Sequence, residues 1–350
     1  MDPDWLQSNR ALASFTSMAV GGPARWFVNV DSAARLCEAL DLAHSRKWSV
    51  LVLGGGSNLV IDDTGFDGLV LHINLLGLQT NMEGGATAVR VAAGEPFDRV
   101  IQRLVGMGLG GVECLSGIPG AAGAAPIQNI GAYGQEICEV VQSVEAVSLE
   151  TGMTKCFDRE ACDFSYRNSL FKRDPHWVVT SMTLFLEPSE YGNVSYRDVQ
   201  RFFSASGTPT TLSAVRDAVL SIRRSKSMVL DPNDPNSRGC GSFFTNPIVE
   251  PDVINRLRAD TPDVPAYPTQ NGRFKLSAGW LIEHAGLKRG TRFGRVGLSP
   301  KHALAIINLG GACAKDVVHA ASVVRRQVFD QFGVVLVPEP VLVGVALDPM

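Results

Sequence analysis

Two spacings of hydrophobic residues alternate along the chain, and together they predict a mixture of strands and helices. Apolar residues at every second position, or short apolar runs closed by a turn residue, predict strands, whereas apolar residues three or four positions apart predict helices. The predicted strands lie at Arg25–Val30, Val50–Leu53, Ala88–Ala93, His176–Glu187 with Pro188 as a stop, Ala303–Asn308 and Val334–Val337, with a hairpin around Thr151-Gly152. The predicted helices lie at Asp31–Lys47 with Asp31 or Ser32 as N-cap, Phe97–Gly106, Leu212–Arg224, Lys275–Ala285 and Lys315–Phe332.

A glycine-dense stretch from Gly110 to Glu136 interrupts these patterns and carries almost no charge. Glycine in a regular element costs about 0.5–1 kcal/mol relative to alanine, so another interaction must offset that cost. Close approach of backbone N–H groups to a phosphate or a flat ring is the usual one. The alternative is a flexible linker, but Ile118, Ile127 and Tyr133 are too apolar for that. We therefore expect a ligand cradle.

A second glycine loop, Gly54–Asn58, follows the strand predicted at Val50–Leu53. A strand that runs into glycines is typical of phosphate binding. The loop is not a dinucleotide fingerprint, because Leu59 stands where the third glycine of GxGxxG would be, and no GK[ST] closes it as in a P-loop. By itself the loop is equally compatible with a plain β-turn.

Two polar segments complete the pattern. Residues 189–213 are rich in Ser, Thr and Gly, and we expect a mobile insertion that carries Tyr191 and Tyr196. The helix predicted at Leu212–Arg224 should mark a domain boundary. After it, residues 231–247 form a long loop rich in proline and asparagine, and long loops in compact domains are often functional.

Composition narrows the class of protein. With 350 residues, 45% of them hydrophobic and 19% charged, we expect a globular protein of two or three domains. The formal charge is −3 and no basic cluster is longer than Arg223-Arg224, so nucleic acid is not an expected partner. Asp2 and Asp4 precede no apolar run, and no stretch reaches 18 apolar residues, so we expect a cytoplasmic protein that does not bind membranes.

The cysteines favour neither disulfides nor a metal. Their number, seven, is odd, and none is paired as CxxC, so we expect reduced thiols and no metal site. They are Cys37, Cys114, Cys138, Cys156, Cys162, Cys240 and Cys313.

Taken together, the motifs resemble those of a known family. The sequence contains GGGSN at 54–58, GAAPIQNIGAYG at 123–134, YRNS at 166–169, GCGSFFTNP at 239–247 and LVPEP at 336–340. From Phe15 to Val343 the chain resembles the UDP-N-acetylenolpyruvoylglucosamine reductases (MurB) of the type I subclass. The resemblance implies an α+β fold with a two-lobed FAD-binding domain of the vanillyl-alcohol-oxidase (PCMH) type and a smaller C-terminal α/β substrate domain. The expected divisions are 1–78, 79–220 with the insertion near 189–213, and 221–350.

The resemblance also implies the reaction. In that family NADPH reduces a bound FAD, and the enolpyruvyl ether of UDP-N-acetylglucosamine enolpyruvate then takes a hydride and a proton, giving UDP-N-acetylmuramate for peptidoglycan synthesis. Such a step needs a fixed cation and a hydrogen-bond donor beside the developing negative charge. Arg167 and a protonated Glu339 match the family's residues for this task. Ser242 matches the family's proton donor, whereas Cys240 stands at a variable position and is expected to be structural.

Binding residues are likewise carried over by the resemblance. We expect non-covalent FAD, because neither glycine loop contains a histidine; NADPH would be a co-substrate and the protein a monomer. His302 is expected to have a capping or core role. The residues expected at the UDP-sugar are Tyr133, Tyr166, Tyr196, Lys226 and Asn246. The residues expected at FAD are Gly54, Gly55, Gly56, Ser57, Asn58, Leu59, Ser116, Gly117, Pro119, Gly120, Gly123, Ala124, Ile127, Gln128, Asn129 and Gly131.

Three alternatives remain at this point. Without the resemblance, Arg167 would be a surface arginine stacked on tyrosine, Ser242 a turn residue and Glu339 a solvated carboxylate. A related FAD oxidase would share the flavin loops but lack the C-terminal serine motif, and a non-catalytic flavin-binding protein would lack one of the three residues. The chain departs from the family at Pro340, where most members have an aliphatic residue, so the direction of Glu339 is the weakest part of the assignment.

Overall fold

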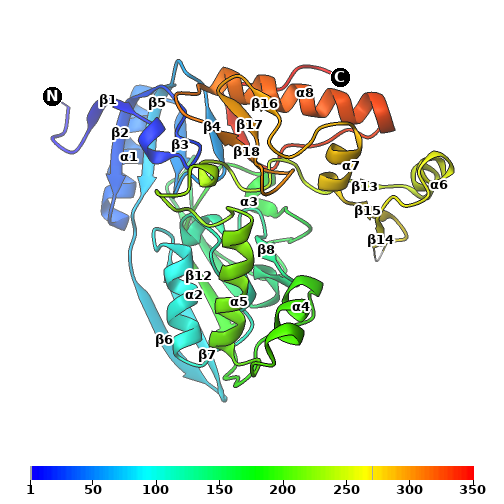
Figure 1. Ribbon diagram of the computed structural model, residues 1–350. Helices are drawn as coiled ribbons and strands as arrows, with labels where there is room; N and C mark the ends of the chain where they lie inside the picture. The colour runs from blue at the N-terminus through cyan, green and yellow to red at the C-terminus, as the bar shows by residue number, and fades with distance from the viewer. Residues whose placement is uncertain (1, 270) are drawn as a thin grey trace. The chain divides into compact units, whose positions relative to one another are not determined.

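The structure is a computed structural model that describes residues 2–269 and 271–350 (Figure 1). It divides into two compact units. Unit 1 comprises the chain up to Arg10, Ala24–Gly56 and Asp67–Val229. Unit 2 comprises Ala11–Pro23, Ser57–Phe66 and Leu230–Met350.

The first sheet of unit 1 has four strands in the order β1-β2-β5-β3 and is covered by one helix. Helix α1 has Ser32 as its N-cap, because the Ser32 hydroxyl accepts a hydrogen bond from the Arg35 N–H at 3.2 Å. Its buried face, which includes Leu36 and Leu40, packs on the strands through residues such as Leu69. The elements are β1 (Gln7–Ala11), β2 (Pro23–Val30), α1 (Ala33–Arg46), β3 (Val50–Leu53) and β5 (Phe66–Ile73).

The second sheet of unit 1 has five antiparallel strands in the order β11-β10-β12-β7-β6. Helices α2 and α5 lie next to each other against this part of the unit (Figure 1). Ile101 and Leu104 of α2 join Val89 and Leu184 in one buried cluster. The elements are β6 (Leu78–Glu83), β7 (Ala86–Ala92), α2 (Phe97–Gly106), β8 (Gly131–Ala132), β9 (Gln135–Glu136), β10 (Val141–Ser148), β11 (Thr154–Asp158), α3 (Leu170–Arg173), β12 (Trp177–Leu186), α4 (Arg197–Ser206) and α5 (Leu212–Ser225).

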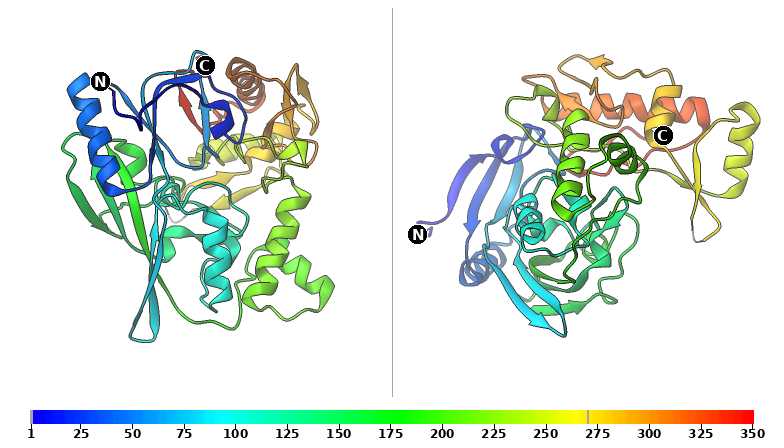
Figure 2. Two further views of the ribbon diagram at one scale, coloured as in Figure 1. Left: turned by 90° about the vertical axis from the view of Figure 1, so that its left-hand side faces the viewer. Right: turned by 60° about the horizontal axis from the view of Figure 1, so that its bottom comes forward.

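The polar insertion contains a helix that the sequence pattern did not predict. Helix α4 lies beside α5 (Figure 2). Over residues 197–205 of this helix the buried side chains are Val199 and Phe203, four positions apart, in a cluster with Val215 and Val219 of α5. Two apolar residues in a segment dominated by Ser, Thr and Gly are too few for the periodicity to stand out.

Unit 2 is built from short strands around one long helix. Strand β4 pairs in parallel with β19, so the chain around residue 60 joins a sheet with the chain around residue 342. Helix α8 buries its apolar face in the core of this unit, together with Phe243 and Phe244. The elements are β4 (Leu59–Ile61), β13 (Ile248–Val249), α6 (Pro251–Asp260), β14 (Ala266–Pro268), β15 (Phe274–Leu276), α7 (Ala278–His284), β16 (Arg292–Phe293), β17 (Val296–Leu298), β18 (Ile306–Asn308), α8 (Ala314–Phe332) and β19 (Val341–Val343).

Most predicted elements are confirmed within a few residues, and β3 and α2 have the predicted bounds. The strand predicted at Val334–Val337 is wrong. Its side chains do alternate between buried and exposed, since Val334 and Leu336 are buried while Val335 and Val337 are exposed. However, the main chain there makes only an isolated bridge, between Phe244 and Pro338, because the facing segment is an irregular loop and offers no continuous ladder.

The compact units cut the chain differently from the three-part division expected from the sequence. Residues 11–23 and 57–66, which that division assigns to the first lobe, belong to unit 2. Residues 57–66 belong to unit 2 because strand β4, which lies in this range, pairs in parallel with β19. Among the described residues no helix has the length and apolar character needed to cross a membrane.

The two glycine segments predicted to bind a ligand meet within unit 1. A Cβ added at Gly55 would lie 2.7 Å from the Cα of Gly120 and 2.9 Å from the Ala121 nitrogen. Those are main-chain atoms that cannot rotate away. A Cβ at the neighbouring Gly54 would lie 3.4 Å from the Ala121 Cβ, which is an ordinary contact distance.

This difference gives a matched pair of variants. We expect Gly55→Ala to lower the free energy of unfolding by about 1–3 kcal/mol, because it forces two backbone segments apart. Gly54→Ala should have a much smaller effect. Urea unfolding of both variants measures the difference, and equal destabilisation by the two would show that the close approach does not restrict residue 55.

Candidate functional site

The expected cofactor cradle consists of close backbone approaches within unit 1. Besides the contact at Gly55, a Cβ on Gly123 would lie 2.6 Å from the Ala93 Cβ. The Gly123 N–H donates to the Ala93 carbonyl at 2.8 Å, which ties the cradle to the end of β7. Gly117 has a φ of +74°, which an L-residue rarely adopts. Main-chain atoms therefore form much of this surface, as a flat ring or a diphosphate requires.

Arg223 of α5 brings a buried cation to this cradle. Its side chain is 8% exposed, and its Nη2 donates to the Met228 carbonyl at 2.7 Å. Its Nε is buried and has no hydrogen-bond partner among the described residues. This Nε is 3.2 Å from the position of a Cβ on Gly117. Burial lowers the pKa of the Arg223 guanidinium, with Tyr133 and Asp98 acting in the opposite direction. A buried donor that lacks a partner beside a glycine favours an oxygen of a bound ligand there.

An ion pair between the buried Arg216 and the partly exposed Asp98 supports the same loop. Arg216 of α5 donates two hydrogen bonds to the carboxylate of Asp98, at 2.7 and 3.0 Å. The Gly117 N–H also donates to Asp98, at 2.6 Å. Burial acts to raise the pKa of Asp98, but Arg216 and the Gly117 N–H outweigh it and hold that pKa below its ordinary value. Asp98 thus fixes the position of Gly117 relative to α2 and α5.

Arg167 is held in place by the second half of the cradle. Its Nη2 donates to the Gly131 carbonyl at 2.6 Å and its Nη1 to the Asn129 carbonyl at 3.4 Å. The Glu136 carboxylate lies 3.6 Å from Nη1, and the guanidinium lies over the Tyr166 ring at 5.1 Å. The side chain is 18% exposed. Arg167 is therefore a positioned cation: it does lie over a tyrosine ring, as the surface alternative expects, but most of its side chain is buried.

The backbone at Arg167 has an unusual conformation that depends on the neighbouring residues. Its φ is +53°, in the left-handed region. A tight turn closes it, since Ser165 and Asn168 exchange two backbone hydrogen bonds of 3.0 Å. Ser169 then fixes the turn on the cradle, because its hydroxyl donates to the Ile127 carbonyl at 2.6 Å. The YRNS and GAAPIQNIGAYG motifs thus form one structural element.

Three of the expected substrate residues also lie together in unit 1. The rings of Tyr133 and Tyr196 are in edge-to-face contact with centroids 5.4 Å apart. The Lys226 ammonium lies 5.8 Å from the centre of the Tyr133 ring and 2.8 Å from the Asp198 carboxylate. Burial raises the pKa of the Tyr133 hydroxyl, so this tyrosine is neutral near pH 7 and can donate a hydrogen bond.

Glu113 is a buried residue of this region whose role the sequence did not reveal. Its side chain is 1% exposed, and its carboxylate accepts four hydrogen bonds. Two come from the N–H groups of Gly111 and Val112, at 2.8 and 3.0 Å. The others come from Gln135 at 2.9 Å and the Asn193 N–H at 2.7 Å. The carboxylate therefore connects the central stretch to the base of the insertion.

In unit 2 the backbone brings Ser242 and Glu339 to neighbouring segments. The Glu339 N–H donates to the Phe243 carbonyl at 2.9 Å, and the Thr245 N–H donates to the Val337 carbonyl at 3.0 Å. Ser242 directly precedes Phe243, so its position along the chain is set next to that of Glu339. Both residues are partly exposed. The main chain therefore places the two segments next to each other.

Asn58 of the GGGSN loop lies beside Glu339. Its amide donates to the Glu339 carbonyl at 3.2 Å, and its own carbonyl accepts from the Val341 N–H at 2.9 Å. Asn246 has a comparable role, since its side chain accepts a hydrogen bond at 3.0 Å from the N–H of Ala278, the first residue of α7. Neither the contact of Asn58 nor that of Asn246 could be predicted from the spacing of residues in the sequence.

Cys240 is structural, as the sequence analysis expected. Its side chain is buried and its thiol donates to the Leu59 carbonyl at 3.6 Å. Burial raises the pKa of the Cys240 thiol to about 12. All seven cysteines are free thiols. His302 accepts a hydrogen bond from the Leu304 N–H at 3.1 Å within a turn, which is a local contact with the backbone.

The remaining expected residues fall into the two units. Ser116 is buried and its hydroxyl donates to the Glu113 carbonyl at 2.6 Å. Unit 2 holds Ser57, Asn58, Leu59, Ser242, Asn246 and Glu339. Unit 1 holds Gly54, Gly55, Gly56, Ser116, Gly117, Pro119, Gly120, Gly123, Ala124, Ile127, Gln128, Asn129, Gly131, Tyr133, Tyr166, Arg167, Tyr196 and Lys226.

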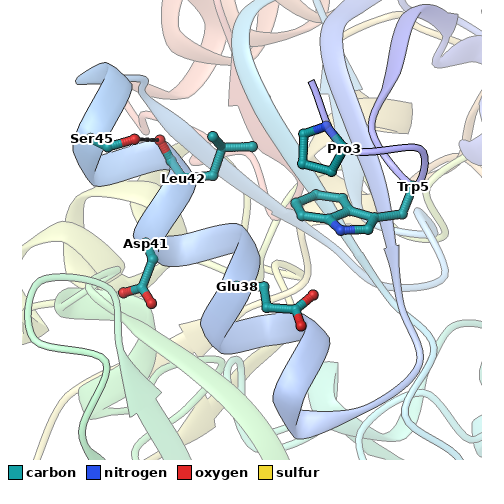
Figure 3. Close-up of a pocket in the computed structure, with 6 residues that line it drawn as sticks. All are labelled: Pro3, Trp5, Glu38, Asp41, Leu42 and Ser45. Carbon is teal, nitrogen blue, oxygen red and sulfur yellow. Dashed lines mark hydrogen bonds between the residues drawn. The ribbon is translucent and has the colours of Figure 1, made fainter. Parts of the chain in front are cut away.

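A separate hollow of about 580 Å³ lies between the N-terminal segment and α1 (Figure 3). Pro3 and Trp5 line one side, and Glu38, Asp41, Leu42 and Ser45 of α1 line the other. Its two carboxylates and its lack of a lining cation make it unsuitable for a diphosphate. None of the expected site residues is among those that line it.

The residues of unit 1 fit a flavin dinucleotide. Glycines that admit no Cβ line the cradle, and the buried Nε of Arg223 needs an acceptor beside it. Both features match the polar edge of a flavin ring or a diphosphate. The glycines of Gly54–Gly56, Ser116–Gly123 and Gly131 would line the cofactor, with Arg223 as an additional donor.

Comparison with known proteins supports the same cofactor. Residues 24–156 match the family model described as an FAD binding domain, and residues 232–343 match that of the UDP-N-acetylenolpyruvoylglucosamine reductase C-terminal domain. The second match includes both Ser242 and Glu339, so the chain carries the C-terminal motif that the oxidase alternative would lack.

Similarity to individual proteins extends over nearly the whole chain. A UDP-N-acetylenolpyruvoylglucosamine reductase from Thermobifida fusca is 44% identical over 349 residues, which cover 97% of this chain and 98% of the relative. One from Saccharopolyspora erythraea is also 44% identical, over 96% and 95% of the two chains. The crystal structure of the Thermus caldophilus enzyme, MurB, has a TM-score of 0.66 at 25% identity and covers 97% and 98% of the two chains. The chain therefore belongs to the UDP-N-acetylenolpyruvoylglucosamine reductase family of FAD-dependent oxidoreductases.

Proposed function

We propose that this chain reduces UDP-N-acetylglucosamine enolpyruvate to UDP-N-acetylmuramate, with bound FAD and with NADPH as co-substrate, in peptidoglycan precursor synthesis. We further propose a cytoplasmic monomer with the three-part division 1–78, 79–220 and 221–350. The observation that carries the catalytic assignment is the hydrogen bond between the Glu339 N–H and the Phe243 carbonyl, which aligns the Glu339 and Ser242 segments. When bound, the flavin supplies hydride transfer from NADPH to the methylene carbon of the enolpyruvyl group.

In this proposal Arg167 stabilises negative charge on the substrate. Addition at the methylene carbon leaves charge conjugated to the substrate carboxylate, and a fixed cation lowers the barrier because it needs no reorganisation. Arg167 suits the task, since two carbonyls and Glu136 hold its guanidinium. Glu339, as a neutral acid, would donate a second hydrogen bond to the same charge.

Ser242 would deliver the proton to the carbon next to the carboxylate. A serine hydroxyl is a weak acid, but a carbanion is a strong enough base to take its proton. The neighbouring thiol is a weaker candidate, because Cys240 is buried and its hydrogen is directed to the Leu59 carbonyl. Tyr133, Tyr166, Tyr196, Lys226 and Asn246 would bind the UDP-sugar, with Lys226 as the point charge for the diphosphate.

The overall reaction can be tested without mutation. Under anaerobic conditions NADPH should bleach the yellow colour of the purified holoenzyme, and the enolpyruvyl UDP-sugar should then restore it. Mass spectrometry should show a product heavier than the substrate by two hydrogens. If the colour returned only on admission of oxygen, the chain would be an oxidase and the proposed function would be wrong.

Ser242 can be separated from the other residues by half-reactions. We expect Ser242→Ala to leave reduction of the flavin by NADPH nearly unchanged and to slow its reoxidation by the enolpyruvyl substrate about 10²–10⁴-fold, as loss of a general acid does. Stopped-flow absorbance measures both steps. Cys240→Ala is the control and should affect neither chemical step. A large loss in the cysteine variant, or equal losses in both half-reactions for Ser242→Ala, would contradict the assignment.

For Glu339 we expect the glutamine variant to retain more activity than the alanine variant. Glutamine keeps a neutral N–H donor of similar reach, whereas alanine removes the donor altogether. Single-turnover reoxidation of the reduced flavin is the measurement. If Glu339 instead acts as an anion, Glu339→Gln should be as damaging as Glu339→Ala.

A further inference from the structure

Lys226, the residue proposed to bind the substrate diphosphate, already has an anionic partner from its own chain. Its ammonium lies 2.8 Å from the carboxylate of Asp198, and 32% of each side chain is exposed. Lys226 is the C-cap of α5, whereas Asp198 lies in the first turn of α4. The pair therefore joins the inserted helix to the binding lysine.

The surroundings of this pair are those expected around a bound diphosphate. The Lys226 ammonium is 5.8 Å from the Tyr133 ring, and the Tyr133 ring contacts Tyr196 at 5.4 Å. Tyr196 is two residues from Asp198 on the same segment. Three of the five proposed substrate residues are therefore joined by these contacts, and the ammonium among them is paired with a carboxylate of the protein itself.

The segment that carries Asp198 is built to reach this position. Gly134 has a φ of +86°, and a Cβ there would lie 2.9 Å from the Ser195 hydroxyl oxygen. The base of the insertion is fixed by the hydrogen bond from Asn193 to Glu113. Helix α4 buries Val199 and Phe203. Asp198 is thus delivered to Lys226 by an ordered element.

We propose that Asp198 is a built-in counter-ion of Lys226 that the diphosphate of the UDP-sugar has to displace. The proposal rests on the proposed role of Lys226. A carboxylate at 2.8 Å and a diphosphate cannot both occupy the same side of one ammonium without strong like-charge repulsion. Because only molecules with a released lysine are competent, the apparent dissociation constant is the intrinsic constant divided by the fraction of molecules in which Lys226 is unpaired.

This exchange makes Asp198 a determinant of specificity. A weakly held monoanion gains little by replacing a carboxylate that is already in place, whereas a diphosphate brings more charge to the same ammonium. Displacement also removes the ion pair that connects Lys226 to α4.

The test uses UDP as a competitive inhibitor of the holoenzyme against the enolpyruvyl substrate. We expect Asp198→Asn to lower the inhibition constant of UDP about three- to tenfold, since removal of the carboxylate both frees Lys226 and removes repulsion. Asp217→Asn is the matched control, because it makes the same change of charge at an exposed position of α5. It should leave the constant unchanged.

A Lys226→Ala background tests the role of Lys226 in binding the diphosphate separately from the role of Asp198 as its counter-ion. Lys226→Ala should raise the UDP inhibition constant, and adding Asp198→Asn to it should bring no tightening comparable to that in the wild-type background. If Lys226→Ala had no effect on UDP, the proposed role of Lys226 would be wrong. If Lys226 mattered but Asp198→Asn left UDP binding unchanged or weakened it, Asp198 would be only a structural partner of α4 and the counter-ion proposal would be overturned.

Discussion

The close approach of two backbones at Gly55 and Gly120 is the constraint on which the site in unit 1 depends. A Cβ at residue 55 would lie 2.7 Å from the Gly120 Cα, so the end of β3 and the central stretch can meet only as bare main chain. The same requirement recurs at Gly123 against Ala93 and at Gly131 against the Arg167 guanidinium. Surfaces without side chains are what let a flat cofactor approach, and here they also let an arginine reach main-chain carbonyls.

The charged side chains around this site differ in whether all of their hydrogen-bonding groups have partners. Two carboxylates have their partners within the chain, since the buried Glu113 has four donors and the partly exposed Asp98 has Arg216 and the Gly117 N–H. Burying a charge is costly unless it is paired in this way. In contrast, the buried Nε of Arg223 has no partner among the described residues. These two carboxylates are thus paired within the unit, whereas a buried guanidinium nitrogen is left to donate to an acceptor. This distribution of charge is expected of a site for a dinucleotide and an anionic substrate.

The fold class and the family could be predicted because each motif is a short stretch of sequence whose residues are required by the structure of that same stretch. Gly131, for example, is restricted to glycine because a Cβ there would lie 2.9 Å from the main-chain oxygen of Gln135, which is close to it in the sequence. Contacts made over long sequence separations could not be predicted. Asn58, for example, donates to the Glu339 carbonyl and accepts from the Val341 N–H, and nothing in its neighbourhood in the sequence indicates these two hydrogen bonds.

The secondary structure was missed where few residues carry the pattern. Helix α4 rests on two buried apolar residues, and β19 spans three residues paired with a strand about 280 positions earlier, in a register that is set by tertiary contact. The error at Val334–Val337 has the opposite origin. There the burial alternates as in a strand, but the neighbouring loop cannot supply a ladder. Periodicity reports which side chains are buried, and it does not report whether the main chain has a partner.

The arrangement around Pro340 shows why a proline is compatible with a functional glutamate before it. In a regular strand the N–H groups of residues two apart point the same way. The Glu339 N–H, however, donates to Phe243, and the Val341 N–H donates to Asn58, which belongs to a different segment. The chain therefore changes direction at residue 340, which lies in a bend and is buried. The N–H groups on both sides of Pro340 make hydrogen bonds, so the bend does not depend on an N–H at residue 340. The fixed φ of the proline also restricts the main chain next to Glu339. The departure from the family at this position thus adds rigidity where the proposed acid is attached.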